Sequence, residues 1–302
     1  MINQEEIKGI IPPVVTIFNE EGDLDKRGMG DLIDSLISSG VNGLLLLGSS
    51  GEFNQMSLEQ RKDVASFGVS YVDGRVPVLI GTGSNNTQES IILSQHAQEI
   101  KADGVVIINP YYWQLTEQNI INHYSDIAKS ISIPVLLYNF PDRSGQDLTP
   151  RLVLKIVEKN SNIIGIKETV DSASHIREMI FTLKEKYPNF KVFSGFDDYV
   201  LSTLQIGGDG AILGSSNFAA DLAVKIYNDY INEDYKEAAS KQRNLSKLAP
   251  IFAVESPIIS PIKEAVKICG LNISTHVLSP AKQLDEISKQ TIYDTLKDAT
   301  II

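Results

Sequence analysis

Short runs of consecutive apolar residues alternate with amphipathic stretches along most of this 302-residue chain. Within each run the apolar residues are continuous and do not alternate with polar ones, which is typical of parallel strands buried on both faces. The pattern therefore favours an α/β protein. It predicts strands at Val14–Phe18, Gly43–Leu47, Val76–Ile80, Gly104–Ile108, Pro134–Tyr138, Ile163–Lys167, Lys191–Ser194 and Gly210–Leu213.

Most of the predicted strands are followed by a segment that begins like a helix. Ser57 stands three residues before Gln60, as in a capping box, and Thr149 is a capping residue followed by proline. Thr116 opens a similar stretch. Eight strand–helix units predict a (β/α)8 TIM barrel, which needs about 250 residues. A doubly wound open sheet is the alternative, but it usually has fewer strands, and Gly81-Thr82-Gly83 is only a fragment of a dinucleotide-binding fingerprint.

The alternation of strands and helices ends near residue 230, and the pattern beyond it is purely helical. It predicts helices at Asp234–Leu248, Ser260–Cys269 and Pro280–Lys297. We therefore expect two domains: a catalytic barrel over residues 1–230 and a small helical domain over residues 231–302. The second is expected to pack on the barrel or on a neighbouring subunit.

Composition narrows the class of protein. The net charge of −11 argues against a nucleic-acid partner, because an anionic protein repels phosphate backbones. No apolar run approaches the roughly 20 residues that span a bilayer, so no membrane partner is expected. Cys269 is the only cysteine, which excludes an internal disulfide and fits a reducing compartment. Because the first residues also lack a secretion signal, we expect a cytoplasmic protein.

One lysine interrupts an apolar strand. Lys167 follows Ile163-Ile164-Gly165-Ile166 and precedes Glu168. A lysine acts as a nucleophile only when its amine is neutral, and a dry site disfavours the charged form. Such an amine condenses with a ketone to give a Schiff base. The simpler interpretation is a strand that ends at a solvated Lys–Glu pair.

In a barrel the active site lies at the carboxyl ends of the strands, so the residues that follow each strand matter most. The second strand is followed by Gly48-Ser49-Ser50-Gly51-Glu52, whose hydroxyls and backbone amides suit an anion, although it also fits a plain turn. Tyr138 ends the fifth strand, where a phenol can transfer protons. Arg143 follows it and can grip a carboxylate, or it is simply a surface residue.

Two other kinds of chemistry receive less support. The four histidines are scattered and have no metal-ligand spacing, so we expect no metal site. The loop Gly214-Ser215-Ser216-Asn217 lies where many barrels bind phosphate, which keeps a phosphosugar isomerase as an alternative. That loop has no second basic residue to support a dianion.

Taken together, four motifs resemble those of the dihydrodipicolinate synthase / N-acetylneuraminate lyase family of Schiff-base aldolases. They occur in the family's order and at its spacing, and the resemblance covers essentially the whole chain. They are Gly48-Ser49-Ser50-Gly51-Glu52, Tyr111-Tyr112, Tyr138-Asn139-Phe140-Pro141 and Gly165-Ile166-Lys167-Glu168. The resemblance implies a TIM barrel that forms a covalent lysine Schiff base with pyruvate and needs no cofactor and no metal.

The resemblance also implies roles for individual residues. Lys167 would form the Schiff base, and Tyr138 would be the acid and base during formation of the carbinolamine and of the carbon–carbon bond. Ser49 would pass protons to Tyr138. Tyr112 would assist from an adjacent subunit. Members of the family are usually homotetramers built as dimers of dimers, so an oligomer is expected.

The binding residues follow from the same resemblance. Ser50, with the amides of its loop such as that of Gly51, would hold the carboxylate of a 2-keto acid substrate. The carbonyl of Ile212 would line the site. Serine or threonine is the family's usual choice at the two loop positions, so Ser49 and Ser50 fit it.

Within the family the chain most resembles the bacterial 2-keto-3-deoxygluconate aldolases. That likeness rests on Ile10-Ile11-Pro12-Pro13, Asn109-Pro110-Tyr111-Tyr112-Trp113, Gly145-Gln146-Asp147-Leu148-Thr149-Pro150 and Ser274-Thr275-His276-Val277-Leu278. Arg143 departs from it, because dihydrodipicolinate synthases use an arginine there for the carboxylate of aspartate semialdehyde. The alternative is therefore a 4-hydroxy-tetrahydrodipicolinate synthase. A non-catalytic sensor is a further alternative, which the retention of Lys167 and Tyr138 argues against.

Overall fold

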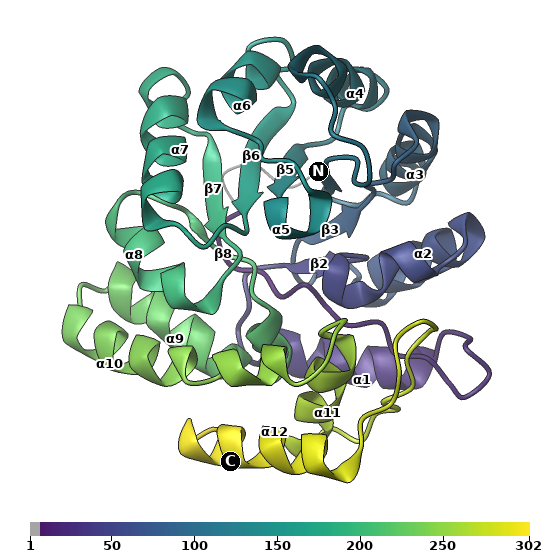
Figure 1. Cartoon of the computed structure of the whole chain (residues 1–302), viewed down its shortest axis with the longest axis vertical. Coiled ribbons are helices and arrows are strands. Elements are labelled where there is room, and N and C mark those ends of the chain that lie inside the picture. The colour runs from purple at the N-terminus through teal and green to yellow at the C-terminus, as the bar shows by residue number, and fades with distance from the viewer. Residues whose placement is uncertain (1–6) are drawn as a thin grey trace.

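The computed structural model describes residues 7–302. Within them one sheet of parallel strands has the order β1-β8-β7-β6-β5-β4-β3-β2, and helices surround it (Figure 1). The strands are β1 (Gly9–Ile10), β2 (Leu44–Leu46), β3 (Val78–Gly81), β4 (Gly104–Ile108), β5 (Val135–Asn139), β6 (Ile163–Glu168), β7 (Lys191–Ser194) and β8 (Gly210–Ala211). The predicted (β/α)8 barrel is confirmed.

The prediction was wrong about the first strand. It lies at β1, which pairs with β8, and not at Val14–Phe18. Pro12 and Pro13 follow β1 after Ile11, and because proline has no N–H the regular ladder ends there. The barrel is closed through the acceptors that remain: Leu45 N donates to Pro12 O at 2.9 Å, and Val14 N donates to Leu45 O at 2.9 Å.

The helix starts expected from the sequence are confirmed where they were proposed. Ser57 and Gln60 form a capping box at α2 (Leu58–Val72). Thr116 and Thr149 accept hydrogen bonds at the starts of α4 (Glu117–Lys129) and α6 (Pro150–Val157). Each cap satisfies an N–H group that the helix itself cannot pair. The barrel helices are α1 (Lys26–Ser38), α2 (Leu58–Val72), α3 (Thr87–Glu99), α4 (Glu117–Lys129), α5 (Pro141–Ser144), α6 (Pro150–Val157), α7 (Ala173–Lys186), α8 (Val200–Gln205) and α9 (Ala220–Ile231).

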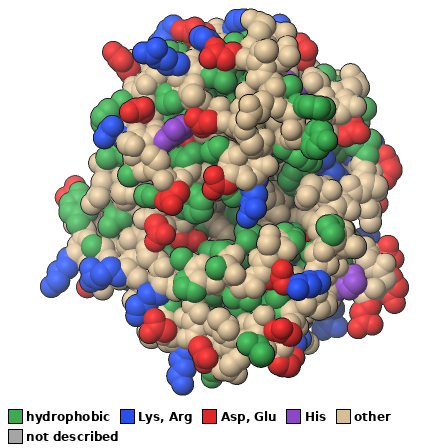
Figure 2. All heavy atoms as spheres, viewed as in Figure 1, with side chains coloured by type: hydrophobic (Ala, Val, Ile, Leu, Met, Phe, Trp, Pro, Cys, Tyr) green, Lys and Arg blue, Asp and Glu red, His purple; other side chains and the backbone are tan. Residues whose placement is uncertain are grey.

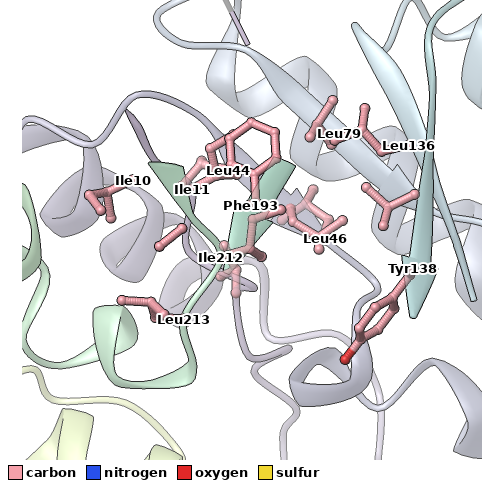
Figure 3. Close-up of a cluster of buried hydrophobic side chains, with 14 of the residues drawn as sticks. Ile10, Ile11, Leu44, Leu46, Leu79, Leu136, Tyr138, Phe193, Ile212 and Leu213 are labelled. Carbon is pink, nitrogen blue, oxygen red and sulfur yellow. The ribbon is translucent and has the colours of Figure 1, made fainter. Parts of the chain in front are cut away.

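Side chains from the strands fill the barrel interior. Leu44, Leu46, Leu136 and Phe193 point toward one another there, and each is fully buried (Figure 3). Tyr138 lies two residues beyond Leu136, so it belongs to the next layer toward the carboxyl ends of the strands. Its hydroxyl points away from the apolar cluster (Figure 3). The packed core therefore ends where the polar site begins.

Three helices follow the barrel: α10 (Tyr235–Ser246), α11 (Ile259–Ile268) and α12 (Glu286–Asp298). The first two match the prediction, whereas α12 begins later than Pro280, because Asp285 supplies the cap by accepting from Ser288 N at 2.8 Å. In Figure 1 α11 and α12 lie beyond α1 on one side of the barrel. The proposed domain boundary at residue 231 stays a prediction.

Candidate active site

Lys167 and Tyr138 lie side by side at the carboxyl ends of two neighbouring strands. The register of β5 and β6 pairs one with the other, and each is only 4% exposed. The Lys167 Nζ atom lies 4.3 Å from the centroid of the Tyr138 ring. An amine can form an imine with a ketone, and an adjacent phenol can transfer the protons that this reaction needs.

The serine turn, Ser49–Gly51, follows β2 as a short 3-10 helix. Ser49 Oγ lies 3.4 Å from the Tyr138 hydroxyl, which is long for an O–H···O bond. Ser50 is buried and faces the same cavity. Gly51 differs from the expectation: it does not line the cavity, and its N–H already donates to Gly48 O at 2.9 Å.

These side chains share one cavity of about 570 Å³. Figure 2 shows the hollow near the middle of the face viewed there, with basic and acidic side chains at its rim. Of the residues proposed from the sequence, the cavity brings together Lys167, Tyr138, Ser49, Ser50, Arg143 and Ile212. A cavity of this volume accommodates a sugar acid as well as pyruvate.

Arg143 lies on α5 at the exposed side of the cavity. Its guanidinium lies 5.8 Å from the centroid of the Phe140 ring. Among residues 7–302 no carboxylate forms an ion pair with it. The arginine can therefore interact with an anionic group of a bound molecule.

The side chain of Tyr112 points into solvent, away from the rest of its own chain. Its side chain is 84% exposed and packs edge-on against Trp113, which is 72% exposed. Its φ of 97° is unusual for a non-glycine residue and is a strained conformation. It does not line the cavity, whereas its neighbour Tyr111 does. Tyr112 therefore does not join Lys167 and Tyr138 within its own chain.

Comparisons with known proteins agree with the geometry. The model of the "Dihydrodipicolinate synthetase family" matches residues 6–299. The chain belongs to this family. It is 50% identical to the "Putative 2-dehydro-3-deoxy-D-gluconate aldolase YagE" and 47% identical to the "Probable 2-dehydro-3-deoxy-D-pentonate aldolase YjhH", both of Escherichia coli K12, over 96% of each chain. The crystal structure of YagE with pyruvate superposes with a TM-score of 0.97 at 48% identity, covering 98% of this chain and 99% of YagE.

Thr169 and Asp197 are among the cavity residues that were not proposed from the sequence. Thr169 is 5% exposed, and its hydroxyl has no hydrogen-bond partner within residues 7–302. Asp197 accepts a short hydrogen bond from Ser215, and burial raises the pKa of its carboxyl to about 7. Both follow strands, β6 and β7, so the rule that pointed to Tyr138 would have found them. Either can bind a substrate hydroxyl.

The loop Gly214–Asn217 does not behave as a phosphate site. Ser215 donates to Asp197, Ser216 donates to Leu213 O, and the Asn217 amide donates to Pro13 O and Gly214 O. Their polar groups are therefore engaged within the protein, and only Gly214 lines the cavity. Within the described part of the chain, no three His, Cys, Asp or Glu side chains could hold a metal ion.

A polar network lies behind the reacting pair, on the outer face of the same two strands. Asn139 follows Tyr138, and Glu168 follows Lys167, so their side chains point away from the cavity. Asn139 Nδ2 donates to Glu168 Oε2 at 3.2 Å and to Asp147 Oδ1 at 2.8 Å. His175 completes the network, with Nε2 at 3.1 Å from Asp147 Oδ2 and Nδ1 at 3.3 Å from Glu168 Oε2.

The network shifts the protonation of its members. Hydrogen bonds to Asp147 and Glu168 raise the pKa of His175 to about 10. Burial raises the pKa of Glu168 to about 7, although His175 and Asn139 oppose the shift. Burial alone would raise the pKa of Asp147 too, but the hydrogen bonds from His175 and Asn139, together with the charge of His175, outweigh it and hold this pKa below its usual value. At neutral pH His175 is therefore an imidazolium between two carboxyl groups.

This network makes stability depend on pH. The pKa of His175 and that of Glu168 are both higher in the folded protein than in the unfolded chain. Each group therefore contributes its full stabilisation below its unfolded pKa, and that stabilisation is lost as the pH rises through the folded pKa. The loss occurs between pH 4.5 and about pH 7 for Glu168 and between pH 6.5 and about pH 10 for His175. We expect the free energy of unfolding to fall less steeply across pH 4.5–10 in the Glu168→Gln/His175→Gln variant than in the wild type. Urea unfolding across that range measures it, and parallel curves would contradict it.

Proposed function

We propose that this chain is a class I, pyruvate-dependent aldolase that reversibly cleaves a 2-keto-3-deoxy sugar acid to pyruvate and an aldehyde. A substrate of the 2-keto-3-deoxygluconate type fits best. The observation that carries the proposal is the buried contact between Lys167 and Tyr138 at the base of the cavity. The names of YagE and YjhH support the substrate class, since 2-dehydro-3-deoxy and 2-keto-3-deoxy describe the same acids.

The proposed reaction begins when the neutral amine of Lys167 adds to the C2 ketone of the sugar acid. Proton transfers through Tyr138 convert the carbinolamine to an iminium and release water. The iminium withdraws electrons, so loss of the C4 hydroxyl proton breaks the C3–C4 bond, releases the aldehyde and leaves an enamine. Protonation of the enamine at C3 and hydrolysis then release pyruvate and restore the lysine.

Other residues would bind the substrate and relay protons. Ser49 lies within reach of the Tyr138 hydroxyl and would pass protons to and from it. Ser50 and the main-chain N–H of Gly51 would hold the carboxylate, although the Gly51 N–H must first leave Gly48 O. The carbonyl of Ile212 would line the site. The covalent imine makes a separate cofactor or metal unnecessary in this scheme.

The proposal extends to the state of the protein in the cell. No helix in the described residues 7–302 is long and apolar enough to cross a membrane. On the composition, with its single cysteine, we propose a cytoplasmic enzyme. We further propose a homotetramer, a dimer of dimers, in which Tyr112 reaches the site of an adjacent subunit. Its exposure and strained backbone support that placement, because an interface would cover both exposed rings.

Arg143 supports one alternative, a 4-hydroxy-tetrahydrodipicolinate synthase. Such an enzyme condenses pyruvate with aspartate semialdehyde, whose carboxylate would need a cation. The guanidinium of Arg143 lies at the cavity and has no ion-pair partner in the described structure, so it is free for that role. A neutral aldehyde such as glyceraldehyde would leave the cation without an anion to bind.

The deciding experiment incubates the purified protein with 2-keto-3-deoxygluconate and couples pyruvate release to lactate dehydrogenase. A parallel reaction supplies pyruvate and aspartate semialdehyde and follows the condensation product. Pyruvate release with negligible condensation supports the aldolase. Condensation without release would replace it by the synthase. Failure of both, together with failure of borohydride to attach pyruvate to Lys167, would make the chain a binding protein.

A further inference from the structure

A buried ion pair joins the serine turn to the C-terminal region. Glu52, directly after the turn, and Lys263, on α11, are both fully buried. The Lys263 Nζ atom lies 2.5 Å from Glu52 Oε1, although 211 residues separate the two in the sequence. The Nζ atom also lies 5.0 Å from the centroid of the Phe18 ring, so the ammonium is enclosed by protein.

Three more hydrogen bonds involve the segment after α11, and two of them join it to Glu52 and Gln55, which follow the serine turn. Lys263 Nζ donates to His276 O at 2.6 Å, and Leu278 N donates to Glu52 Oε2 at 2.7 Å. Gln55 Nε2 donates to Leu278 O at 2.8 Å. We call the side chains of Glu52, Gln55 and Lys263, with the main chain of His276 and Leu278, the clasp.

The clasp contains a buried ion pair, which is a weak way to stabilise a fold. Burial raises the pKa of Glu52 and lowers that of Lys263, which shows how far each is removed from water, while the partner charge opposes both shifts. Well-packed apolar side chains often match or exceed the stability of a buried ion pair. Glu52 also has a φ of 62°, in the left-handed region that non-glycine residues rarely adopt. A defined geometry, more than stability, accounts for these features.

That geometry concerns the active-site cavity. Glu52 is two residues from Ser50 and three from Ser49, and Gln55 lines the cavity itself. Beyond the clasp, Pro280 lines the cavity, and so do Ile258 and Ile259 at the start of α11. The C-terminal region thus forms an apolar wall of the cavity and, through Lys263, fixes the loop on which the two serines lie.

We propose that the clasp is a positioning device for the serine turn. It holds Ser50 where a 2-keto acid carboxylate must lie for its ketone to reach Lys167, and Ser49 within reach of the Tyr138 hydroxyl. The inference rests on the proposed function, because it assumes that pyruvate binds at this turn. It makes the C-terminal region a working part of the active site, although that region contributes none of the reacting groups.

The test uses the full-length protein and pyruvate with borohydride, which reduces the imine and leaves a stable mass increase on Lys167. Lys263→Met leaves Glu52 as a lone buried charge and is expected to lower the melting temperature by roughly 5–15 °C. The double variant Glu52→Gln/Lys263→Met has no lone buried charge and is expected to regain most of that loss. It nevertheless lacks the hydrogen bond between Glu52 and Lys263 of α11. The pyruvate concentration that gives half-saturation should therefore rise about 10-fold, the effect of losing one charged hydrogen bond.

If the clasp only stabilised the fold, its loss would have a different effect. It would reduce the amount of folded, trappable protein without changing the half-saturating concentration of pyruvate. A double variant with wild-type stability and half-saturation within twofold of wild type would therefore overturn the proposal. If the double variant does not fold, Glu52→Asp replaces it, since this change keeps both charges and shortens the reach. An unchanged half-saturation in Glu52→Asp would overturn the proposal equally.

Two controls separate this inference from the proposed function. Lys247→Met removes a C-terminal ion pair, Lys247–Asp298, away from the cavity, and should leave half-saturation unchanged. Wild-type protein must first be trapped by pyruvate at Lys167. If it is not, the proposed function fails. If it is trapped and the clasp variants bind pyruvate as the wild type does, only the positioning role fails.

Discussion

Replacing Lys167 with methionine is expected to abolish pyruvate release from 2-keto-3-deoxygluconate, with kcat falling by at least about four orders of magnitude, as for loss of a covalent nucleophile. No other lysine within residues 7–302 lines the cavity. Arg143 cannot substitute for it, because a guanidinium stays protonated in proteins. Methionine matches the length of the lysine stem, so the melting temperature should not fall. Fixed-time assays of pyruvate release measure kcat, and thermal unfolding of the same preparation measures the melting temperature.

The matched control for this variant is Lys159→Met. Lys159 is exposed just beyond α6 and does not line the cavity, so its loss should leave kcat within twofold of wild type. Borohydride with pyruvate should add mass to the control but not to Lys167→Met. Substantial turnover by Lys167→Met, or trapping of pyruvate on a different residue, would rule out the Schiff-base mechanism at this position.

The barrel could be predicted because its strands are buried on both faces. Continuous apolar runs mark such strands directly, and capping residues such as Ser57 mark the helices between them. The pattern failed where hydrogen bonding, not polarity, decides the boundary. Pro12 and Pro13 end β1 early although the apolar run continues, and Asp285 starts α12 after the proline that was expected to start it.

The core of the site could be predicted for a related reason. A barrel gathers the carboxyl ends of its strands at one face, so residues far apart in sequence, such as Ser49, Tyr138 and Lys167, are expected to meet. The structure brings them to one cavity. The turn at Gly51 could not be predicted at this level, since the pairing of its N–H with Gly48 O depends on backbone torsions that a motif does not specify.

The partners behind the site lay beyond sequence reasoning. Nothing in the pattern around Lys263 indicates that it pairs with Glu52, because helix periodicity states which face is buried and not what that face meets. His175 likewise looks like one of several scattered histidines until the fold sets it between Asp147 and Glu168. Such long-range polar pairs are specified by tertiary packing, and a single sequence carries no local sign of them.

Tyr138→Phe is expected to lower kcat for sugar-acid cleavage by about 10²–10⁴-fold, the usual contribution of a positioned acid or base. The change removes only the hydroxyl, 3.4 Å from Ser49 Oγ, and keeps the ring that lies 4.3 Å from the Lys167 amine. Pyruvate should therefore still bind with a half-saturating concentration close to that of wild type. The rate at which borohydride traps the imine should fall with kcat, because forming the imine also needs proton transfer.

Comparison with Ser49→Ala shows whether the two hydroxyls act as one unit. If Ser49 passes protons through Tyr138, Ser49→Ala should cost less than Tyr138→Phe, and the double variant should be no slower than Tyr138→Phe alone. Losses that multiply would instead mean that the serine acts independently, for example by binding the substrate carboxylate. A wild-type kcat in Tyr138→Phe would exclude the phenol from the mechanism, so another group of the cavity would have to transfer the proton. Asp197 lines the cavity and has a raised pKa, which makes it the candidate for that role.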